Sequence, residues 1–173
     1  MTDAITVHEA GRELRYTFAN LMHYHGFGFP GGVAHAFKVM QRALPLLSPD
    51  GPPERREIAI RTPFAGPGAR DAFEMVLRCL TEGRYTVDAS LAAVERGETL
   101  KGYVFILTYR GRTVRLTIRE GIVRDEFIAL GRKKDRTPEE DARLEELKQD
   151  MASRLLALAP ADAYDAVLET QPA

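Results

Sequence analysis

Two runs of alternating residues, separated by Arg110-Gly111, constrain the fold of this chain most strongly. Residues 103–109 and 112–119 have the two-residue period of β-strands, and Gly111 can adopt the positive φ that a tight turn needs. The first run is apolar on both faces, which is typical of a strand that is covered on both sides. The sequence therefore predicts an antiparallel hairpin whose first strand lies centrally in a sheet.

Helical patterns surround this hairpin. Apolar residues at steps of three and four predict helices over residues 6–22, 32–46, 69–82, 122–130, 137–158 and 161–168, and a short one over 89–95. Thr6 and Glu9 have the spacing of a capping box, as do Thr137 and Glu140. Helix starts are therefore expected at both places.

Two further segments, residues 56–62 and 84–88, are predicted to be extended. The mixture of elements predicts a single α+β domain, with a small antiparallel or mixed sheet packed against helices. We expect an α+β core over residues 1–130 and a C-terminal helical extension of the same domain over 131–173.

Composition argues against several classes of protein. A net charge of −1 over 173 residues provides no global basic field for nucleic acid or an anionic membrane. No apolar run approaches the roughly 18 residues of a membrane span, and the N-terminus lacks the pattern of a signal peptide. One cysteine cannot form an internal disulfide, so a cytoplasmic location is expected.

The first candidate site is the stretch His23-Tyr-His25, which runs into a loop with four glycines and one proline. In an extended segment the two imidazoles would point to the same side and could bind zinc, iron or copper. The alternative is that one histidine caps the preceding helix and the other is exposed.

Cys79 is the second candidate. It follows Asp71 by eight residues, a little over two helical turns, so the two side chains would share a broad side of one helix. Cys79 could be a ligand or a nucleophile, or a buried apolar filler. Asp71 and Glu74 could serve as acid, base or metal ligand, whereas Glu74 could equally pair with Arg78. No nucleophile and base are evident within mutual reach, so enzymatic activity stays open.

A third candidate is Gly66-Pro67-Gly68 with Arg70. Glycines before a helix N-terminus, together with an arginine, could hold an anion. A tight turn between strand and helix explains the glycines equally well.

The order of these landmarks resembles the FmdE-like family, which is named after a component of formylmethanofuran dehydrogenase. That family has a His-Gly-His-x-Cys-Pro-Gly loop, and here His25-Gly-Phe-Gly-Phe-Pro-Gly31 has the same length, the same first His-Gly and the same closing Pro-Gly. Its second landmark is an Asp-Ala-Ile-Gln helix with a cysteine eight residues after the aspartate. Asp71-Ala-Phe-Glu74 followed by Cys79 matches that spacing, and the hairpin and the C-terminal helical tail also look similar.

The chain departs from the family at several ligand positions. Phe27 and Phe29 stand where the family has its second loop histidine and its loop cysteine, and Gly68 stands where a cysteine commonly precedes the Asp-Ala pair. The family's zinc-ribbon cysteines at the C-terminus are missing. The loop would therefore have a more apolar wall, with His23 as a replacement ligand.

The resemblance implies a metal-binding accessory protein with four potential ligands: His23, His25, Cys79 and Asp71. Zinc or iron is the expected metal. A homodimer and a partnership with an oxidoreductase are also implied. The alternative is a small-molecule module, for example for haem, with His23 or His25 as the anchor and a pocket formed by Phe27, Phe29 and Gly31.

Overall fold

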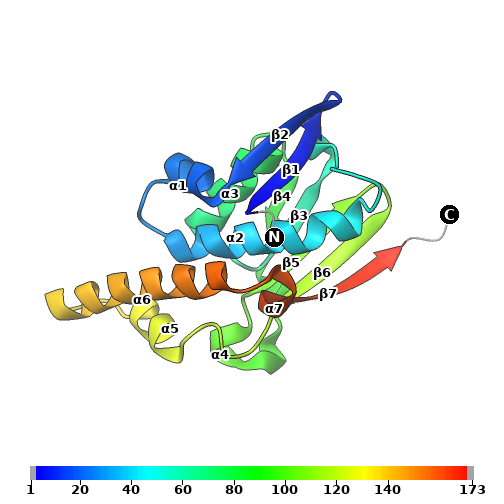
Figure 1. Cartoon of the computed structure of the whole chain (residues 1–173). Coiled ribbons are helices and arrows are strands. Elements are labelled where there is room, and N and C mark those ends of the chain that lie inside the picture. Colours follow the sequence, from blue (N-terminus) through cyan, green and yellow to red (C-terminus); the bar gives the residue numbers. More distant parts are fainter. Residues whose placement is uncertain (1–2, 171–173) are drawn as a thin grey trace.

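The structure, a computed structural model, describes residues 3–170 and contains a five-stranded sheet and a separate two-stranded hairpin (Figure 1). The hairpin consists of β1 (Ala4–Glu9) and β2 (Arg12–Thr17). The sheet has the order β4-β3-β5-β6-β7, with β3 and β4 parallel and all other neighbours antiparallel. Its strands are β3 (Ala59–Thr62), β4 (Tyr85–Val87), β5 (Val104–Tyr109), β6 (Arg112–Ile118) and β7 (Tyr164–Thr170).

Helix α2 (Pro30–Leu47) is the central helix, because it packs on β5, β6 and β7 and also on α3 and α6. Figure 1 shows α2 crossing in front of the sheet, with α6 beside it. The other helices are α1 (Phe18–His25), α3 (Pro67–Leu77), α4 (Gly97–Leu100), α5 (Asp125–Arg132), α6 (Pro138–Ala157) and α7 (Pro160–Ala163). Among residues 3–170, no helix combines the length and the apolar character that crossing a membrane requires.

The prediction of an α+β fold is confirmed. The central hairpin is present as β5 and β6, and Phe105 and Leu107 are fully buried between the sheet and the helices. The helix expected over 32–46 is α2, the extended piece at 84–88 contains β4, and the helix expected over 137–158 is α6. The capping box of α6 is formed as expected, with Thr137 and Glu140 each accepting from the other's backbone N–H.

The prediction of a helix over residues 6–22 is wrong for residues 6–17, and only residues 18–22 are helical, as part of α1. Residues 6–17 belong to the β1–β2 hairpin, turned by Ala10-Gly11 with φ values of 49° and 76°. Such positive φ values at both turn positions match the twist of the flanking strands. The segment has apolar residues at steps of three and four, which is the helical pattern. Ile5 and Val7 also have the two-residue period of a strand, and both are buried. The capping box lies later, between Thr17 and Asn20 at the start of α1.

The prediction of a terminal helix over 161–168 is also wrong. Helix α7 stops at Ala163, and the chain continues as β7, which pairs along all seven of its residues with β6. Pairing buries Tyr164 completely against the core. Of the extension expected over 131–173, the described residues 131–170 are therefore not wholly helical, since they also provide an edge strand of the main sheet.

Several other boundaries differ from expectation. The helix expected over 69–82 ends at Leu77, because Arg78 adopts a left-handed conformation with φ 55°. The helix expected over 122–130 begins at Asp125. Of the strand expected over 56–62, only Ala59–Thr62 is β3, after a short 3₁₀ turn. Residues 89–96 form two further 3₁₀ turns rather than one helix.

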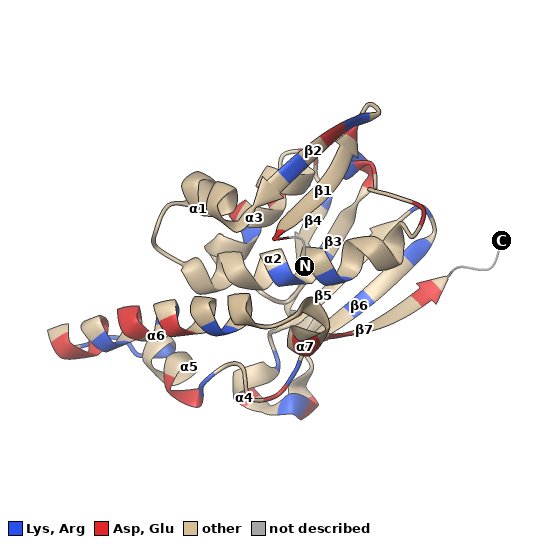
Figure 2. Cartoon of the chain, viewed as in Figure 1, with Lys and Arg blue, Asp and Glu red and all other residues tan. Residues whose placement is uncertain are grey.

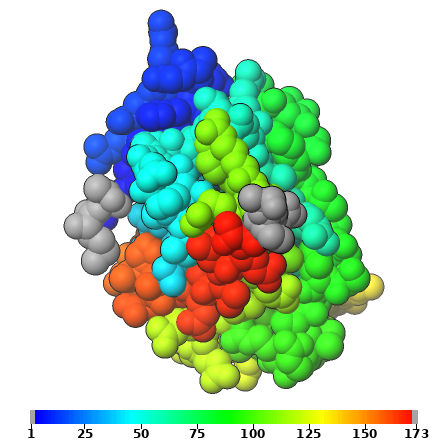
Figure 3. Space-filling model, turned by 90° about the vertical axis from the view of Figure 1, so that its right-hand side faces the viewer, coloured from blue at the N-terminus to red at the C-terminus, as the bar shows by residue number. Residues whose placement is uncertain are grey.

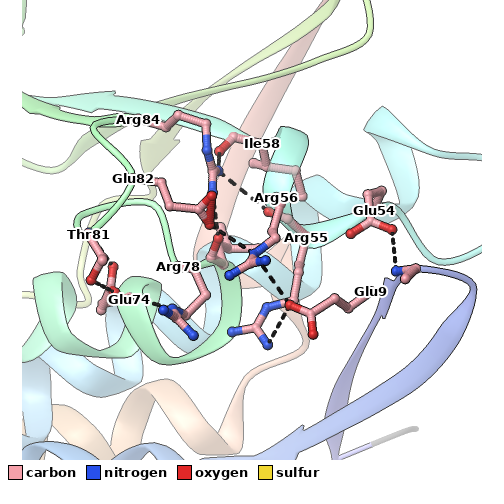
Figure 4. Close-up of polar contacts among 12 residues, drawn as sticks. Glu9, Glu54, Arg55, Arg56, Ile58, Glu74, Arg78, Thr81, Glu82 and Arg84 are labelled. Carbon is pink, nitrogen blue, oxygen red and sulfur yellow. Dashed lines mark hydrogen bonds and ion pairs between the residues drawn. The ribbon is translucent and has the colours of Figure 1, made fainter.

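A network of charged side chains fastens the hairpin to the main body (Figure 4). Arg56 Nε lies 3.4 Å from Glu9 Oε1 and 3.0 Å from Glu82 Oε1, so it joins β1 to the segment before β4. Arg84 donates to the backbone carbonyls of Ile58 and Leu77. Elsewhere both signs of charge are interspersed, as Figure 2 shows along α6. We interpret the network as structural, because its cations already have carboxylate or carbonyl acceptors.

Candidate functional site

The glycine-rich stretch becomes a short connection between two helices. Helix α1 ends at His25, residues 26–29 form the loop, and α2 begins at Pro30. Gly26 has a φ of 88° and ends α1 by donating its N–H to the carbonyl of Met22, 2.7 Å away. A helix therefore flanks the loop at each end, and His25 is the last residue of the helix that precedes it.

Two other glycines allow the N-termini of α2 and α3 to approach each other. A Cβ on Gly68 would lie 2.5 Å from the carbonyl oxygen of Phe29, and one on Gly32 would lie 3.1 Å from the backbone nitrogen of Ala69. Position 68 has no room for a side chain, and a side chain at position 32 would require the backbone of α3 to shift slightly. Gly68 of the expected anion loop is thus explained by close packing of backbone on backbone, and an added Cβ at Gly66 would meet the ring of Phe64.

This packing brings His25 and Asp71 together. His25 Nδ1 lies 2.8 Å from Asp71 Oδ2, and the imidazole side chain is only 6% exposed. Arg70 Nε lies 2.9 Å from the other carboxylate oxygen, Oδ1. Both residues are among the candidates that the sequence indicates, and the packing of α1 on α3 joins them across 46 positions.

The charge state of Asp71 follows from its neighbours. Burial acts to raise the pKa of this carboxyl, but hydrogen bonds from His25 and Arg70 and the charge of Arg70 outweigh it, so the pKa is lowered. An ionised Asp71 accepts a hydrogen bond when Nδ1 of His25 carries a proton. In the neutral tautomer with that proton, the free lone pair of the imidazole is on Nε2.

The Nε2 atom of His25 is buried and has no hydrogen-bond partner among the described residues. An unpaired buried polar atom is unfavourable, and most such atoms in folded proteins are satisfied. The neighbouring aromatic ring is that of Phe29, whose centroid lies 5.9 Å from that of His25. The site thus presents one oriented ring nitrogen that no described group uses.

His23 lies away from this arrangement. It is exposed in the last turn of α1, and residues two apart on a helix point to different sides. The expectation that His23 and His25 point the same way assumed an extended segment, and that assumption is wrong because α1 continues to His25. The alternative reading holds for one of the pair: His23 is the exposed histidine.

Cys79 is fully buried just after α3. Burial, followed by the charge of Glu74, raises the pKa of its thiol to about 12. Glu74 accepts hydrogen bonds from the Leu80 and Thr81 N–H groups at 2.7 and 3.0 Å, and it pairs with Arg78 at 3.8 Å. Glu74 therefore stabilises the residues that follow the C-terminal end of α3. Of its two expected roles, these contacts match the structural one, the pair with Arg78, rather than that of an acid, base or metal ligand.

Cys79 is expected to react slowly with thiol reagents in the folded protein, because the thiolate is the nucleophile and burial keeps this thiol protonated. Labelling with a maleimide at pH 7.5, followed by mass spectrometry, measures the rate. Protein unfolded in urea should react at least about 100-fold faster, as expected when exposure limits the reaction. Equal rates in both states would show that Cys79 is accessible.

The aromatic residues of the loop lie at the surface. Phe27 is 78% exposed, Tyr24 53% and Phe29 45%, and Lys148 Nζ lies 4.7 Å from the centre of the Phe29 ring. Gly31 is buried in the first turn of α2, where an added Cβ would lie 3.3 Å from Met151 Sδ. Phe27 and Phe29 are therefore surface residues rather than the walls of an enclosed pocket, and Phe29 lies next to His25.

Tyr85 is a further residue of this region that sequence reasoning missed. Its hydroxyl is buried without a hydrogen-bond partner among residues 3–170. Burial raises the pKa of this hydroxyl, the charge of Asp71 acts in the same direction, and the charge of Arg70 opposes both. A tyrosine in a three-residue strand gives no sequence signal of such a position, since its place depends on the parallel pairing of β4 with β3.

Within the described part of the chain, no group of three or more His, Cys, Asp or Glu residues is arranged to hold a metal ion. The structure joins His25 to Asp71, and it does not gather His23 and Cys79 with them into such a group. No protein-family model matches the chain, and no curated protein matches it either.

Proposed function

We propose that this chain is a metal-binding protein in which His25 Nε2 is the ligand and Asp71 orients it. The observation that carries this proposal is the buried Nε2 atom without a partner among the described residues, on a ring whose Nδ1 lies 2.8 Å from a carboxylate. Histidine ligands of metals commonly donate their second ring N–H to a carboxylate in this way. A neutral imidazole of that tautomer fits zinc or iron.

One ligand does not complete a coordination sphere. The remaining positions would be filled by water, by a second copy of the chain, or by an organic cofactor that carries the metal. Bound there, the metal would supply Lewis-acid or redox chemistry. An accessory role beside an oxidoreductase, as the family resemblance implies, is compatible with a site that is completed from outside.

The test compares two histidines that are two positions apart. His25→Ala should reduce the affinity for zinc at least about 100-fold, and Asp71→Asn by about 10- to 100-fold because it loses the orienting carboxylate. His23→Ala is the matched control and should leave the affinity unchanged, since His23 is exposed and outside the pair. Zinc affinity is measured by competition with a chromophoric chelator, and metal content by elemental analysis of untagged protein.

Two outcomes would overturn the proposal. One is untagged protein that carries no metal and binds neither zinc nor ferrous iron. The other is His25→Ala protein that binds as tightly as the wild type while remaining folded by circular dichroism.

Haem is the second candidate, because iron in a macrocycle needs only one imidazole from the protein. Tyr24, Phe27 and Phe29 are exposed aromatic residues of the same segment that could contact an apolar ring. Added haemin should then give a Soret band that His25→Ala abolishes and His23→Ala retains. A spectrum identical to that of free haemin would remove haem from consideration.

A further inference from the structure

An apolar groove lies between the outer edge of β1 and the C-terminal half of α2. Its volume is about 390 Å³, and its walls include Ala4 and Thr6 of β1, Met40 and Leu44 of α2, and prolines of the connection over residues 49–53. Figure 3 views the side of the molecule where the N-terminal hairpin, α2 and the C-terminal segment meet. No Lys, Arg, Asp or Glu of the described chain lines this groove.

The edge of β1 that faces the groove carries backbone N–H and C=O groups that do not pair with β2. In the β1–β2 register, the two-residue turn makes Glu9–Arg12, Val7–Leu14 and Ile5–Tyr16 the hydrogen-bonded pairs. The N–H and C=O groups of Ala4, Thr6 and His8 therefore point to the outer edge. His8 uses its N–H there, donating to the carbonyl of Pro53 at 2.8 Å.

The pairing of β1 with the segment around Pro53 does not extend from His8 toward Ala4 within the described residues. Residues 52 and 53 are both proline and have no N–H to donate. Among residues 3–170, the backbone hydrogen bond that crosses this edge is the one from His8 to Pro53, with the single bridge between His8 and Glu54. The groups of Ala4 and Thr6 face a groove whose lining is mostly apolar.

We propose that this groove binds an extended, uncharged segment of another polypeptide, which adds to the free edge of β1. The outward groups of Ala4 and Thr6 are two residues apart, about 6.6 Å along the strand, and that spacing of donor and acceptor matches an extended backbone. Side chains of such a segment would contact Met40, Leu44 and the prolines. A charged segment is disfavoured, because the groove provides no opposite charge to compensate for lost water.

A library of randomised heptapeptides, displayed on phage and selected on the full-length protein, provides the probe. We expect enriched sequences that are free of charge at alternate positions. Affinity of a labelled enriched peptide is then measured by fluorescence polarisation. Thr6→Pro should weaken it about tenfold or more, because it removes an outward N–H and places a ring on the edge.

Arg15→Pro is the matched control. Arg15 is the cross-strand partner of Thr6 and has the same non-hydrogen-bonded register, but its outward groups lie on the opposite edge of the hairpin. It should leave peptide affinity within about twofold of the wild type, which is below the effect of a typical hydrogen bond. If Thr6→Pro fails to fold, Pro45→Glu takes its place in the test. The new glutamate puts a charge on the groove wall. Because the substitution removes a proline from inside α2, the variant should fold at least as well as the wild type.

Three results would overturn the proposal. The first is a library without enriched peptides. The second is an enriched peptide that binds the Thr6→Pro and Pro45→Glu variants as tightly as the wild type. The third is a wild-type dimer that Thr6→Pro dissociates, which would make a second copy the occupant. In the supporting result, the Thr6 amide gains protection from hydrogen exchange when the peptide is added.

Discussion

The protein is expected to lose stability steadily as the pH falls from about 6.5 to 5, by about 1.4 kcal/mol per pH unit. The cause is His35, which is buried in the middle of α2. Its Nδ1 lies 2.7 Å from the Tyr164 hydroxyl and its Nε2 lies 2.9 Å from Met151 Sδ. The centroid of its ring lies 4.7 Å from that of Tyr103, and the two rings are tilted by 40°. Burial lowers the pKa of His35 from 6.5 to about 3.

The direction follows from proton binding. Between about pH 6.5 and 3 the unfolded chain binds a proton at His35 and the folded chain does not, so lowering the pH favours unfolding. The upper part of this window lies above the ordinary pKa values of Asp and Glu, which keeps their contribution small there. Urea unfolding at pH 7.0, 6.0 and 5.0 measures the slope.

His35→Gln is the informative variant, because its amide can still bond to Tyr164 but does not titrate. Its free energy of unfolding should vary less with pH than that of the wild type by about 1.4 kcal/mol per unit. His23→Gln changes an exposed histidine and should keep the wild-type slope. A wild-type slope no steeper than that of His35→Gln would contradict a neutral, buried His35.

Gly68→Ala is expected to lower the free energy of unfolding by about 3 kcal/mol, at the upper end of the usual range for overpacking. The new Cβ would lie 2.5 Å from the carbonyl oxygen of Phe29 and 3.1 Å from the nitrogen of Val33, and backbone atoms cannot move aside as a flexible side chain can. Because the same contact holds the loop against α3, the variant should also separate His25 from Asp71 and weaken metal binding.

Gly131→Ala is the matched control for Gly68→Ala. Both glycines are in helices, but an added Cβ at 131 would meet nothing within 4 Å. Its stability should stay near that of the wild type or rise by up to about 1 kcal/mol. Chemical denaturation of both variants provides the comparison, and a Gly68→Ala protein as stable as the wild type would show that α2 and α3 are not packed this closely.

Much of the fold follows from local pattern, as α2, α6 and the β5–β6 hairpin show. The errors occurred where two periodicities coexist in one segment. Ile5, Val7 and Leu14 fit a strand as well as a helix, and the decision depends on the turn at Ala10-Gly11. At the C-terminus, Tyr164 joins a strand because the edge of β6 is available, which is a tertiary effect that no local pattern contains.

The site is predictable from the sequence only in part. The residue types and their spacing indicate His25 and Asp71 as candidates. Their contact, however, depends on Gly68 and Gly32, which allow the N-termini of α2 and α3 to pack closely, and the sequence pattern does not predict that packing. Gly68, which the sequence pattern assigns to an anion loop, is one of the two glycines that allow that contact. Cys79 had the expected spacing along the sequence, yet α3 ends before it because Arg78 leaves the helical conformation. Helix periodicity therefore could not place its thiol.

The most direct measurement of the central claim is the state of the two ring nitrogens of His25. Protein labelled with ¹⁵N at histidine, observed by long-range ¹H–¹⁵N correlation at pH 7.5, distinguishes the tautomers. We predict a proton on Nδ1 and none on Nε2 in the free protein, and a shift of the Nε2 resonance that saturates as zinc is added, with the His23 resonances unchanged. A proton on Nε2, or an Nε2 resonance that zinc leaves in place, would contradict His25 as the metal ligand.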